Sequence, residues 1–459
     1  MAIAASRQQA ASRPRLLQAV FDALGQPDIR RKLLFTAAML VVFRFVAHIP
    51  IPGVDPNVIQ DIIDENPLLG FLNIFSGGAL RQMSVAMLGV YPYITSSIIM
   101  QLVTPLFPAL QALDKEGERG RNRKQLYQYW LTVPLSFVQG YAQLVILETQ
   151  VGNVAGGAIF SPSLTGDDAL VTVTALFAVT AGTLFLVWLG ELITENGIGN
   201  GVSVIIFGGI VAGMPSLINN IFNSDTGVGL VALLAVLAVL LIAAIVFMQE
   251  AVRKIPVQYA KSVFRAGKMY RQSGQSHIPL RVNSAGMIPL IFSFSIVILP
   301  AYMAQFIYDS STTPWIRSVT STINDIFSPS TGQGQGGSPG FYVTVFLLTV
   351  GFSFFYTFVI FQQQNLAENL QKQGGFVPGI RPGRPTADYI QRVMVRITWA
   401  GALFLGLMAV LPYLITQFFN VTALTISATG MLIVVGVVLD TMKQLEAQLL
   451  MRSYEGFIR

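Results

Sequence analysis

The chain has 459 residues, of which 53% are hydrophobic and only 11% are charged, and its mean hydropathy is +0.59. An ordinary soluble domain carries about 25% charged residues, so this much apolar surface cannot all turn inward in a water-soluble fold. The absence of cysteine excludes disulfides, thiolate metal sites and a cysteine nucleophile. These values predict an all-α, polytopic membrane protein, because unpaired backbone in lipid is too costly for any open structure.

The apolar segments predict about ten transmembrane helices, since a hydrocarbon core of about 30 Å requires roughly 20 apolar residues per helix. In chain order, the predicted spans are Leu33 to Ile49, Met83 to Leu106, Tyr127 to Leu147, Leu170 to Gly190, Gly201 to Ile221, Val228 to Met248, Gly286 to Tyr308, Phe341 to Phe361, Ile397 to Leu414 and Val421 to Leu439. The fifth span is the least regular, because Gly201, Gly208, Gly209 and Gly213 lower its helix propensity. Small residues nevertheless suit close helix packing in a bilayer.

Basic residues predict the orientation of these spans. They gather before span one, between spans two and three, six and seven, and eight and nine, and after span ten. The loops at 149–168, 222–227 and 415–420 contain no Lys or Arg. By the positive-inside rule the basic segments are cytosolic, and an even number of spans then places both termini in the cytosol.

Between spans one and two lies an apolar segment, residues 67–78, that is too short to cross the membrane. It can be a re-entrant half-helix that enters the membrane, or an interfacial helix on the outer surface. A re-entrant segment needs protein or water around it, so the first alternative would imply a cavity inside the bundle. The residues alone leave both alternatives open.

Few side chains in the predicted spans are able to carry chemistry. Arg44 is the one charge inside a span; it could line an aqueous path, but it lies near the outer end and is predicted to snorkel to the interface. The two histidines, His48 and His277, fall on opposite sides of the membrane without metal-ligand spacing, and no phosphate-binding loop is present. We therefore expect no cofactor and no enzymatic activity, with energy supplied by a partner or a gradient.

Two basic cytosolic segments are candidates for docking a partner. Residues 250–281 carry seven basic residues against one acidic residue, interleaved with Tyr259, Phe264 and Tyr270. Such a loop can simply fix the topology, or it can bind RNA phosphates or an acidic protein. In residues 374–383, Gly and Pro favour turns that either hold Arg381 out into the cytosol or merely connect two spans.

Several stretches spread over almost the whole chain resemble the SecY family, the channel subunits of the bacterial protein translocase. These stretches are Ile49 to Asp55, Tyr91 to Ile99, Gly190 to Gly201, Ile255 to Lys261, Phe376 to Gly383 and Gln444 to Phe457. Three positions depart from the family pattern: Asn196 replaces a basic residue, Phe361-Gln362-Gln363 replaces Phe-Asn-Pro, and Ser427-Ala428 replaces a glycine pair.

The resemblance implies two inverted halves of five helices each. The first, residues 1–224, contains a plug near 67–78, and the second, residues 225–459, contains the large cytosolic loops 250–285 and 362–396. An aliphatic pore ring is implied, with the members Val90, Ile94, Val202, Ile206, Ile291 and Ile433. The implied plug residues are Phe71, Leu72, Ile74, Phe75, Gly77 and Gly78. Stiff apolar side chains can close around a passing polypeptide, and a narrow apolar neck excludes water and ions.

The resemblance also implies the function and the partners. The function is passage of unfolded secretory polypeptides across the bacterial cytoplasmic membrane and lateral release of membrane proteins into it. The implied partners are the membrane subunits SecE and SecG, the ATPase SecA, the ribosome, signal-bearing polypeptides and membrane lipid. The implied docking residues for the motor or the ribosome are Lys254, Lys261, Lys268 and Arg381.

Two other classes of protein are weighed against this function. A ten-span secondary transporter of a small solute would usually carry ionisable residues at the membrane midplane, whereas here Arg44 alone lies within a span. An intramembrane protease would need paired aspartates or a serine and histidine arrangement inside the spans, and the sequence offers neither. The transporter is therefore the alternative that we retain.

Overall fold

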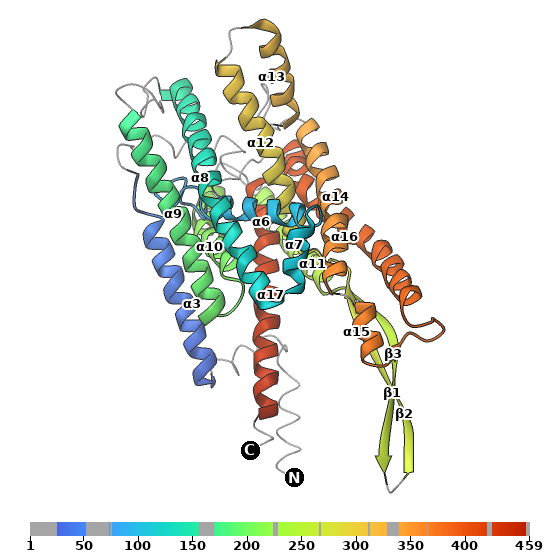
Figure 1. The fold of residues 1–459 in the computed structure, drawn as a ribbon. Coiled ribbons are helices and arrows are strands. Elements are labelled where there is room, and N and C mark those ends of the chain that lie inside the picture. The colour runs from blue at the N-terminus through green and yellow to red at the C-terminus, as the bar shows by residue number, and fades with distance from the viewer. Residues whose placement is uncertain are drawn as a thin grey trace. The chain divides into compact units, whose positions relative to one another are not determined.

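The computed structural model describes residues 25–51, 73, 76–155, 169–223, 228–265, 268–310, 313–327, 339–364, 366–419 and 425–455. The helices are α3 (Pro27–Val46), α6 (Tyr91–Val103), α7 (Pro108–Lys115), α8 (Glu118–Ala155), α9 (Ala169–Asn196), α10 (Gly201–Asn223), α11 (Val228–Glu250), α12 (Ile288–Ser310), α13 (Pro314–Phe327), α14 (Pro339–Gln364), α15 (Leu366–Lys372), α16 (Arg384–Phe419) and α17 (Thr425–Glu455) (Figure 1). The strands are β1 (Val252–Arg265), β2 (Lys268–Arg281) and β3 (Gly375–Phe376).

A helix lies at each of the ten predicted spans, which confirms the mainly helical fold class. Within the described ranges, four helical stretches are long and apolar enough to cross a membrane: Ala169–Asn196, Val231–Glu250, Pro339–Lys372 and Arg384–Leu411. Gly201–Pro215 and Ile288–Val297 are shorter apolar helices. The chain is therefore a multi-pass membrane protein, while the number of ten spans stays a prediction.

Lipid as a solvent explains why these helices expose apolar side chains. In α11, which has no charged residue before Glu250, Val236, Val239 and Phe247 are all more than 60% exposed. In water such a face would need a partner, but lipid tails are as apolar as the side chains themselves. The exposed apolar residues of α11 are consistent with a helix in the membrane.

The chain forms two compact units. Unit 1 comprises residues 1–97, 126–220 and 433–459, and unit 2 comprises residues 98–125 and 221–432. Most of unit 1 falls in the predicted first half and most of unit 2 in the second, but residues 98–125 and 433–459 each cluster with the other half's unit. The inverted relation of two five-helix halves stays a prediction.

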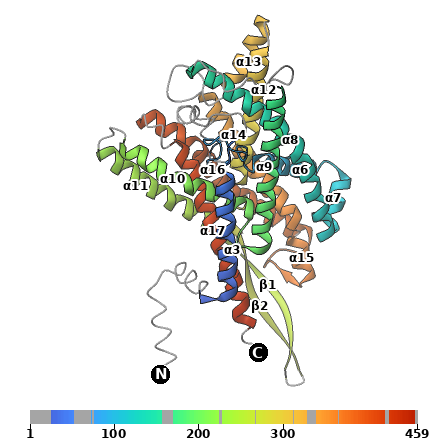
Figure 2. The same cartoon turned by 90° about the vertical axis from the view of Figure 1, so that its left-hand side faces the viewer.

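In unit 2, the segment 250–285 is predicted as a loop, but it contains an antiparallel β-hairpin. The register of the hairpin runs from Val252 paired with Arg281 to Arg265 paired with Lys268. β3 pairs with the other edge of β1, and Figures 1 and 2 show the hairpin as a long ribbon. Buried and exposed side chains alternate along β1, since Ile255 and Val257 are buried while Lys254 and Pro256 are exposed. This period of two residues was the sign of a strand that the sequence offered.

The basic residues between the second and third spans also lie in regular structure. Arg119, Arg121 and Arg123 belong to the first turns of α8, which begins at Glu118 and continues through the predicted third span. α7 precedes it, and Gly120 is needed at the junction because a Cβ there would overlap the backbone of Leu113. What was predicted as a basic loop is therefore a short helix followed by the start of a long one.

Candidate functional site

The predicted pore residues lie on four helices or their starts. In unit 1, Val90 directly precedes α6, Ile94 lies in its first turn, Val202 and Ile206 are one turn apart on α10, and Ile433 belongs to α17. Val90, Ile206 and Ile433 are buried, and Ile94 and Val202 are half-buried. Ile291 lies in the first turn of α12, in unit 2, and is also buried. That these six side chains form one ring stays a prediction.

The plug segment is described at its C-terminal end only. Phe71, Leu72, Ile74 and Phe75 lie outside the described residues, whereas Gly77 and Gly78 are described. Both glycines have positive φ angles, of 68° and 85°, in the left-handed region that favours glycine. This part of the site therefore has a backbone conformation that few other residues could adopt without strain.

Two polar side chains hold this end of the segment together. The amide oxygen of Asn73 accepts a hydrogen bond from the Arg81 backbone N–H at 3.1 Å, and the Gly78 N–H donates to the Asn73 carbonyl at 2.8 Å. The Ser76 hydroxyl donates to the same carbonyl and accepts from the Leu80 N–H. Backbone groups that are not in a regular helix are thereby satisfied, as a buried segment requires.

Arg44 binds the C-terminal end of the predicted plug segment. Its Nη1 donates a hydrogen bond to the carbonyl of Gly77 at 3.0 Å, and its guanidinium lies against Gly78. The sequence did not predict this backbone acceptor for Arg44, and the expectation that Arg44 snorkels to the interface stays a prediction. Hydrogen bonds that involve a charged group contribute about 1.5 to 3 kcal/mol.

Gly77 is enclosed by α3 and α10. Phe43, fully buried on α3, lies so close that a Cβ added to Gly77 would be 2.6 Å from its ring. The same Cβ would be 3.0 Å from Cα of Gly209, and a Cβ added to Gly209 would overlap the Gly77 backbone. Gly208 similarly faces Leu40 of α3. Of the glycines that made span five irregular in sequence, Gly209 is the one that contacts Gly77. We call the residues that meet here the plug anchor: Phe43, Arg44, Gly77, Gly78 and Gly209.

The turn between α9 and α10 sets how closely these two helices of unit 1 approach each other. The Thr194 hydroxyl donates to the Gly190 carbonyl and accepts from the Gly201 N–H, both at 2.9 Å. A Cβ on Gly201 would overlap Gly190, so the two helices can approach this closely only with glycine there. The motif from Gly190 to Gly201 thus sets where α10 begins, and with it the positions of Val202 and Ile206.

The same turn is also held by α3 and α17. The Ile198 N–H donates to the Thr36 hydroxyl at 3.2 Å, and the Gly199 N–H donates to the Gln444 side chain at 3.0 Å. Ile198 packs in a small buried cluster with Ile29 of α3 and Leu445 of α17. Two helices that carry predicted pore residues, α10 and α17, are therefore fixed to one common turn.

A buried polar cluster joins α6 and α8. The hydroxyls of Ser96 and Thr132 are 2.9 Å apart, and the Gln139 amide donates to the Thr95 hydroxyl at 3.3 Å. Gln143, one turn further along α8, is also buried, and its Nε2 has no hydrogen-bond partner among the described residues. Interhelical hydrogen bonds of this kind hold helices together in membranes. Sequence reasoning missed the cluster, although polar residues four apart in an apolar span were the available signal.

The predicted docking residues belong to one assembly of strands and helices in unit 2. Lys254 on β1 and Arg381 are exposed. Lys261 and Lys268 belong to the hairpin strands, but their side chains are not among those that the structure describes. An apolar cluster joins the hairpin to α15, β3 and α16, with the buried members Ile255, Val257, Leu280, Leu370, Val377, Ile390 and Met394. We call this assembly the cytosolic body after the location that the positive-inside rule predicts for its basic segments. It brings together two basic segments that the sequence presents separately.

The described residues contain no group of three His, Asp or Glu side chains that could hold a metal ion. The pKa of Glu368, on α15, is lowered by a hydrogen bond from Lys372 and by the charge of that lysine, which lies 2.8 Å away. Both side chains are exposed, so this pair does not mark a catalytic site.

Comparisons with known proteins agree with this architecture. A family model described as SecY matches residues 84–442. The protein translocase subunit SecY of Streptomyces galbus is 42% identical over 453 residues, covering 97% of this chain and 100% of the relative. The SecY subunit of Halalkalibacterium halodurans is 43% identical over 444 residues, covering 94% and 97%.

Solved structures show the same fold at low sequence identity. A protein-conducting channel superposes with a TM-score of 0.59 at 17% identity, covering 91% of this chain and 92% of the other. Sec61 in a canine ribosome-channel complex superposes with a TM-score of 0.58 at 17% identity and the same coverage. A SecY structure described for its plug domain, which stabilises the closed channel, also has a TM-score of 0.58.

Proposed function

The chain belongs to the SecY family, and on this premise we propose that it is the channel subunit of a protein translocase. It conducts unfolded secretory polypeptides across the cytoplasmic membrane and releases membrane proteins sideways into the lipid. The observation that carries the proposal is the similarity to translocase subunits over 97% of the chain. The transporter alternative is weaker still after the structure, because Arg44, the one charge within a predicted span, is bound to the Gly77 carbonyl.

The proposed closed state combines the aliphatic ring with the plug. The ring comprises Val90, Ile94, Val202, Ile206, Ile291 and Ile433, and the plug segment runs from Phe71 to Gly78. The plug anchor supports this assignment, because it attaches the end of the segment to α3 and α10, the helix that carries Val202 and Ile206. An apolar constriction excludes water and ions by dewetting.

Partners and location follow from the same proposal. SecE and SecG accompany the chain in the bacterial cytoplasmic membrane, with both termini in the cytosol, and SecA or the ribosome docks on the cytosolic body. Lys254, Lys261, Lys268 and Arg381 supply the positive charge for that docking, which attracts acidic protein surfaces or RNA phosphates. The chain itself catalyses no reaction, and the motor or the ribosome supplies the energy.

Reconstitution tests the function directly. The chain, purified with the small membrane proteins that accompany it, is placed in vesicles with a signal-bearing polypeptide, SecA and ATP. We expect the polypeptide to become protected from external protease. Failure of transport in vesicles that accumulate a small solute instead would favour the transporter.

The ring has its own test. Ile433→Asn places an amide in the constriction, at a cost of about 1 to 3 kcal/mol that entering water would relieve. The closed state should weaken, so that polypeptides with defective signal sequences are exported and ions leak. Val438→Asn is the matched control, because Val438 lies on the same helix and is 42% exposed. Unchanged export and conductance in a folded, inserted Ile433→Asn protein would remove Ile433 from the seal.

A further inference from the structure

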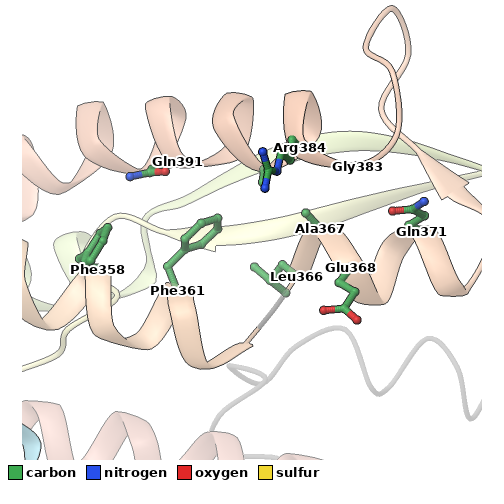
Figure 3. Close-up of a pocket in the computed structure, with 10 residues that line it drawn as sticks. Phe358, Phe361, Leu366, Ala367, Glu368, Gln371, Gly383, Arg384 and Gln391 are labelled. Atoms are coloured by element: carbon green, nitrogen blue, oxygen red, sulfur yellow. The ribbon is translucent and has the colours of Figure 1, made fainter. Parts of the chain in front are cut away.

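A pocket lies in unit 2 where α14 and α15 meet the start of α16 (Figure 3). Its volume is about 590 Å³, within the range of about 300 to 1,000 Å³ that small-molecule sites occupy. Phe358, Phe361 and Leu366 give it an apolar side, and Gln371, Arg384 and Gln391 give it a polar side. The pocket is amphipathic, so it suits a ligand with a polar head and an apolar tail.

The charge around the pocket favours an anion. The one acidic side chain that lines it, Glu368, is paired with Lys372 at 2.8 Å, and Figure 3 shows its carboxylate pointing away from Arg384. Arg384 is exposed and provides donors in a fork that matches a phosphate. Gln371 and Gln391 supply further amide donors on the same rim. The lining carries one acidic and one basic residue, and because Lys372 from outside the lining pairs with Glu368, the charge of Arg384 is left to attract an anion.

The apolar side of the pocket continues into the membrane surface of two helices. Phe358 is 45% exposed, and the exposed residues Val343 and Leu347 lie on the same side of α14, fifteen and eleven residues earlier. On α16, Val395, Trp399, Leu403 and Leu407 form an exposed stripe that begins one turn beyond Gln391. The rings of Phe354 and Trp399 contact at 4.9 Å between centroids, which joins the two helices at that level.

We propose that this pocket binds the headgroup of an anionic phospholipid. The phosphate lies among Arg384, Gln371 and Gln391, and one acyl chain runs past Phe358 along the exposed surface of α14 and α16 toward Trp399. Distances along α16 agree with this placement, because Trp399 lies eight residues beyond Gln391, about 12 Å along the axis. A water-soluble phosphate would leave the aromatic side of the pocket and the adjoining stripe uncovered, so the occupant is a lipid.

Fluorescence quenching tests the proposal on the full chain. Trp130, Trp188 and Trp315 are replaced by Phe, which leaves Trp399 as the reporter beside the acyl chain. The protein is reconstituted in mixtures of phosphatidylcholine and phosphatidylglycerol, with bromine on the acyl chains of one lipid at a time. Quenching against composition gives the relative affinity of the two lipids at Trp399. We expect phosphatidylglycerol to be preferred about fivefold, the factor that corresponds to about 1 kcal/mol for one arginine near an anionic surface.

Three variants separate the pocket from general surface charge. Arg384→Gln should lower the preference to near unity, and Ala387→Phe, which fills the pocket without changing its charge, should lower it too. Arg392→Gln removes the same charge from the same helix outside the pocket and should keep the preference. Equal affinity for both lipids in the parent protein, or equal losses in Arg384→Gln and Arg392→Gln, would overturn the proposal. Retention of the preference in well-folded Arg384→Gln would overturn it as well.

Discussion

The plug anchor in unit 1 and the cytosolic body in unit 2 both attach a non-helical segment to helices, but they do so by different physical means. The plug anchor uses glycine contacts and one charge-assisted hydrogen bond, from Arg44 to Gly77. The cytosolic body uses a cluster of buried aliphatic side chains, with Ile255 and Ile390 almost fully enclosed.

The environment predicted for each region, cytosol for the hairpin and membrane for the plug anchor, accounts for the difference. In water, burying apolar side chains is strongly favourable, by about 25 cal/mol per Å², so an apolar cluster is enough to hold the hairpin. Between helices in lipid that driving force is absent, and close backbone approach and hydrogen bonds take its place. The comparison predicts that the cytosolic body is sensitive to side chains that are made smaller, and the plug anchor to side chains that are made larger.

The largest effect is expected where the cytosolic body loses volume. Ile255→Ala removes three carbons from a side chain that is 2% exposed, and such changes cost about 2 to 5 kcal/mol. The hairpin should detach locally, with faster hydrogen exchange in β1 and β2 and faster cleavage by added protease. Val252→Ala, on the same strand at a position that is 44% exposed, is the control and should change neither rate.

In the plug anchor, the corresponding change is an added side chain. Gly209→Val places a Cβ on the Gly77 backbone, and overpacking of this type costs about 1 to 3 kcal/mol. We expect the plug end to leave its place, which raises the ion conductance of the channel in the absence of a polypeptide. In Gly213→Val, one turn along α10, the new Cβ meets no atom within 4 Å, so this variant should conduct like the parent. Equal leaks in both variants would mean that the helix, and not the contact, was damaged.

Removing the hydrogen bond tests the other component of the anchor. Arg44→Met keeps an unbranched stem but removes the charge and the donors, with an expected loss near the lower end of the range of about 1.5 to 3 kcal/mol. Resting conductance should rise, by less than in Gly209→Val. Arg44→Lys restores a cationic donor and should recover most of the seal. A tight channel in Arg44→Met would leave the glycine contacts as the whole anchor.

The smallest effect is expected at the turn between α9 and α10. Thr36→Val removes the acceptor of the Ile198 N–H and should cost about 1 kcal/mol, seen as a lower midpoint of thermal unfolding in detergent. Thr174→Val is the control, because the Thr174 hydroxyl is exposed and bonds only within its own helix. Equal midpoints for the two variants would show that the turn does not depend on α3.

The sequence by itself determined the class of the protein, the helices at the ten predicted spans and the family, but not α7, α13 and α15. Hydropathy is read from consecutive residues, and lipid tolerates few backbone conformations, so local composition suffices for this much. The basic segments were also found, and the glycines of α10 were recognised as suited to close packing.

Only the tertiary structure decided what those residues contact. From the sequence, Gly209 only lowers the helix propensity of its span. The structure shows that Gly77, far earlier in the chain, lies against it. The acceptor of Arg44, the Gly77 carbonyl, lies 33 residues away in the chain. The basic segment after α11 is predicted as a loop from the sequence, whereas the structure packs Ile255 and Val257 in one apolar cluster with residues of α15 and α16. Each of these contacts joins residues distant in the sequence, and no local pattern can report the position of an atom that another part of the chain supplies.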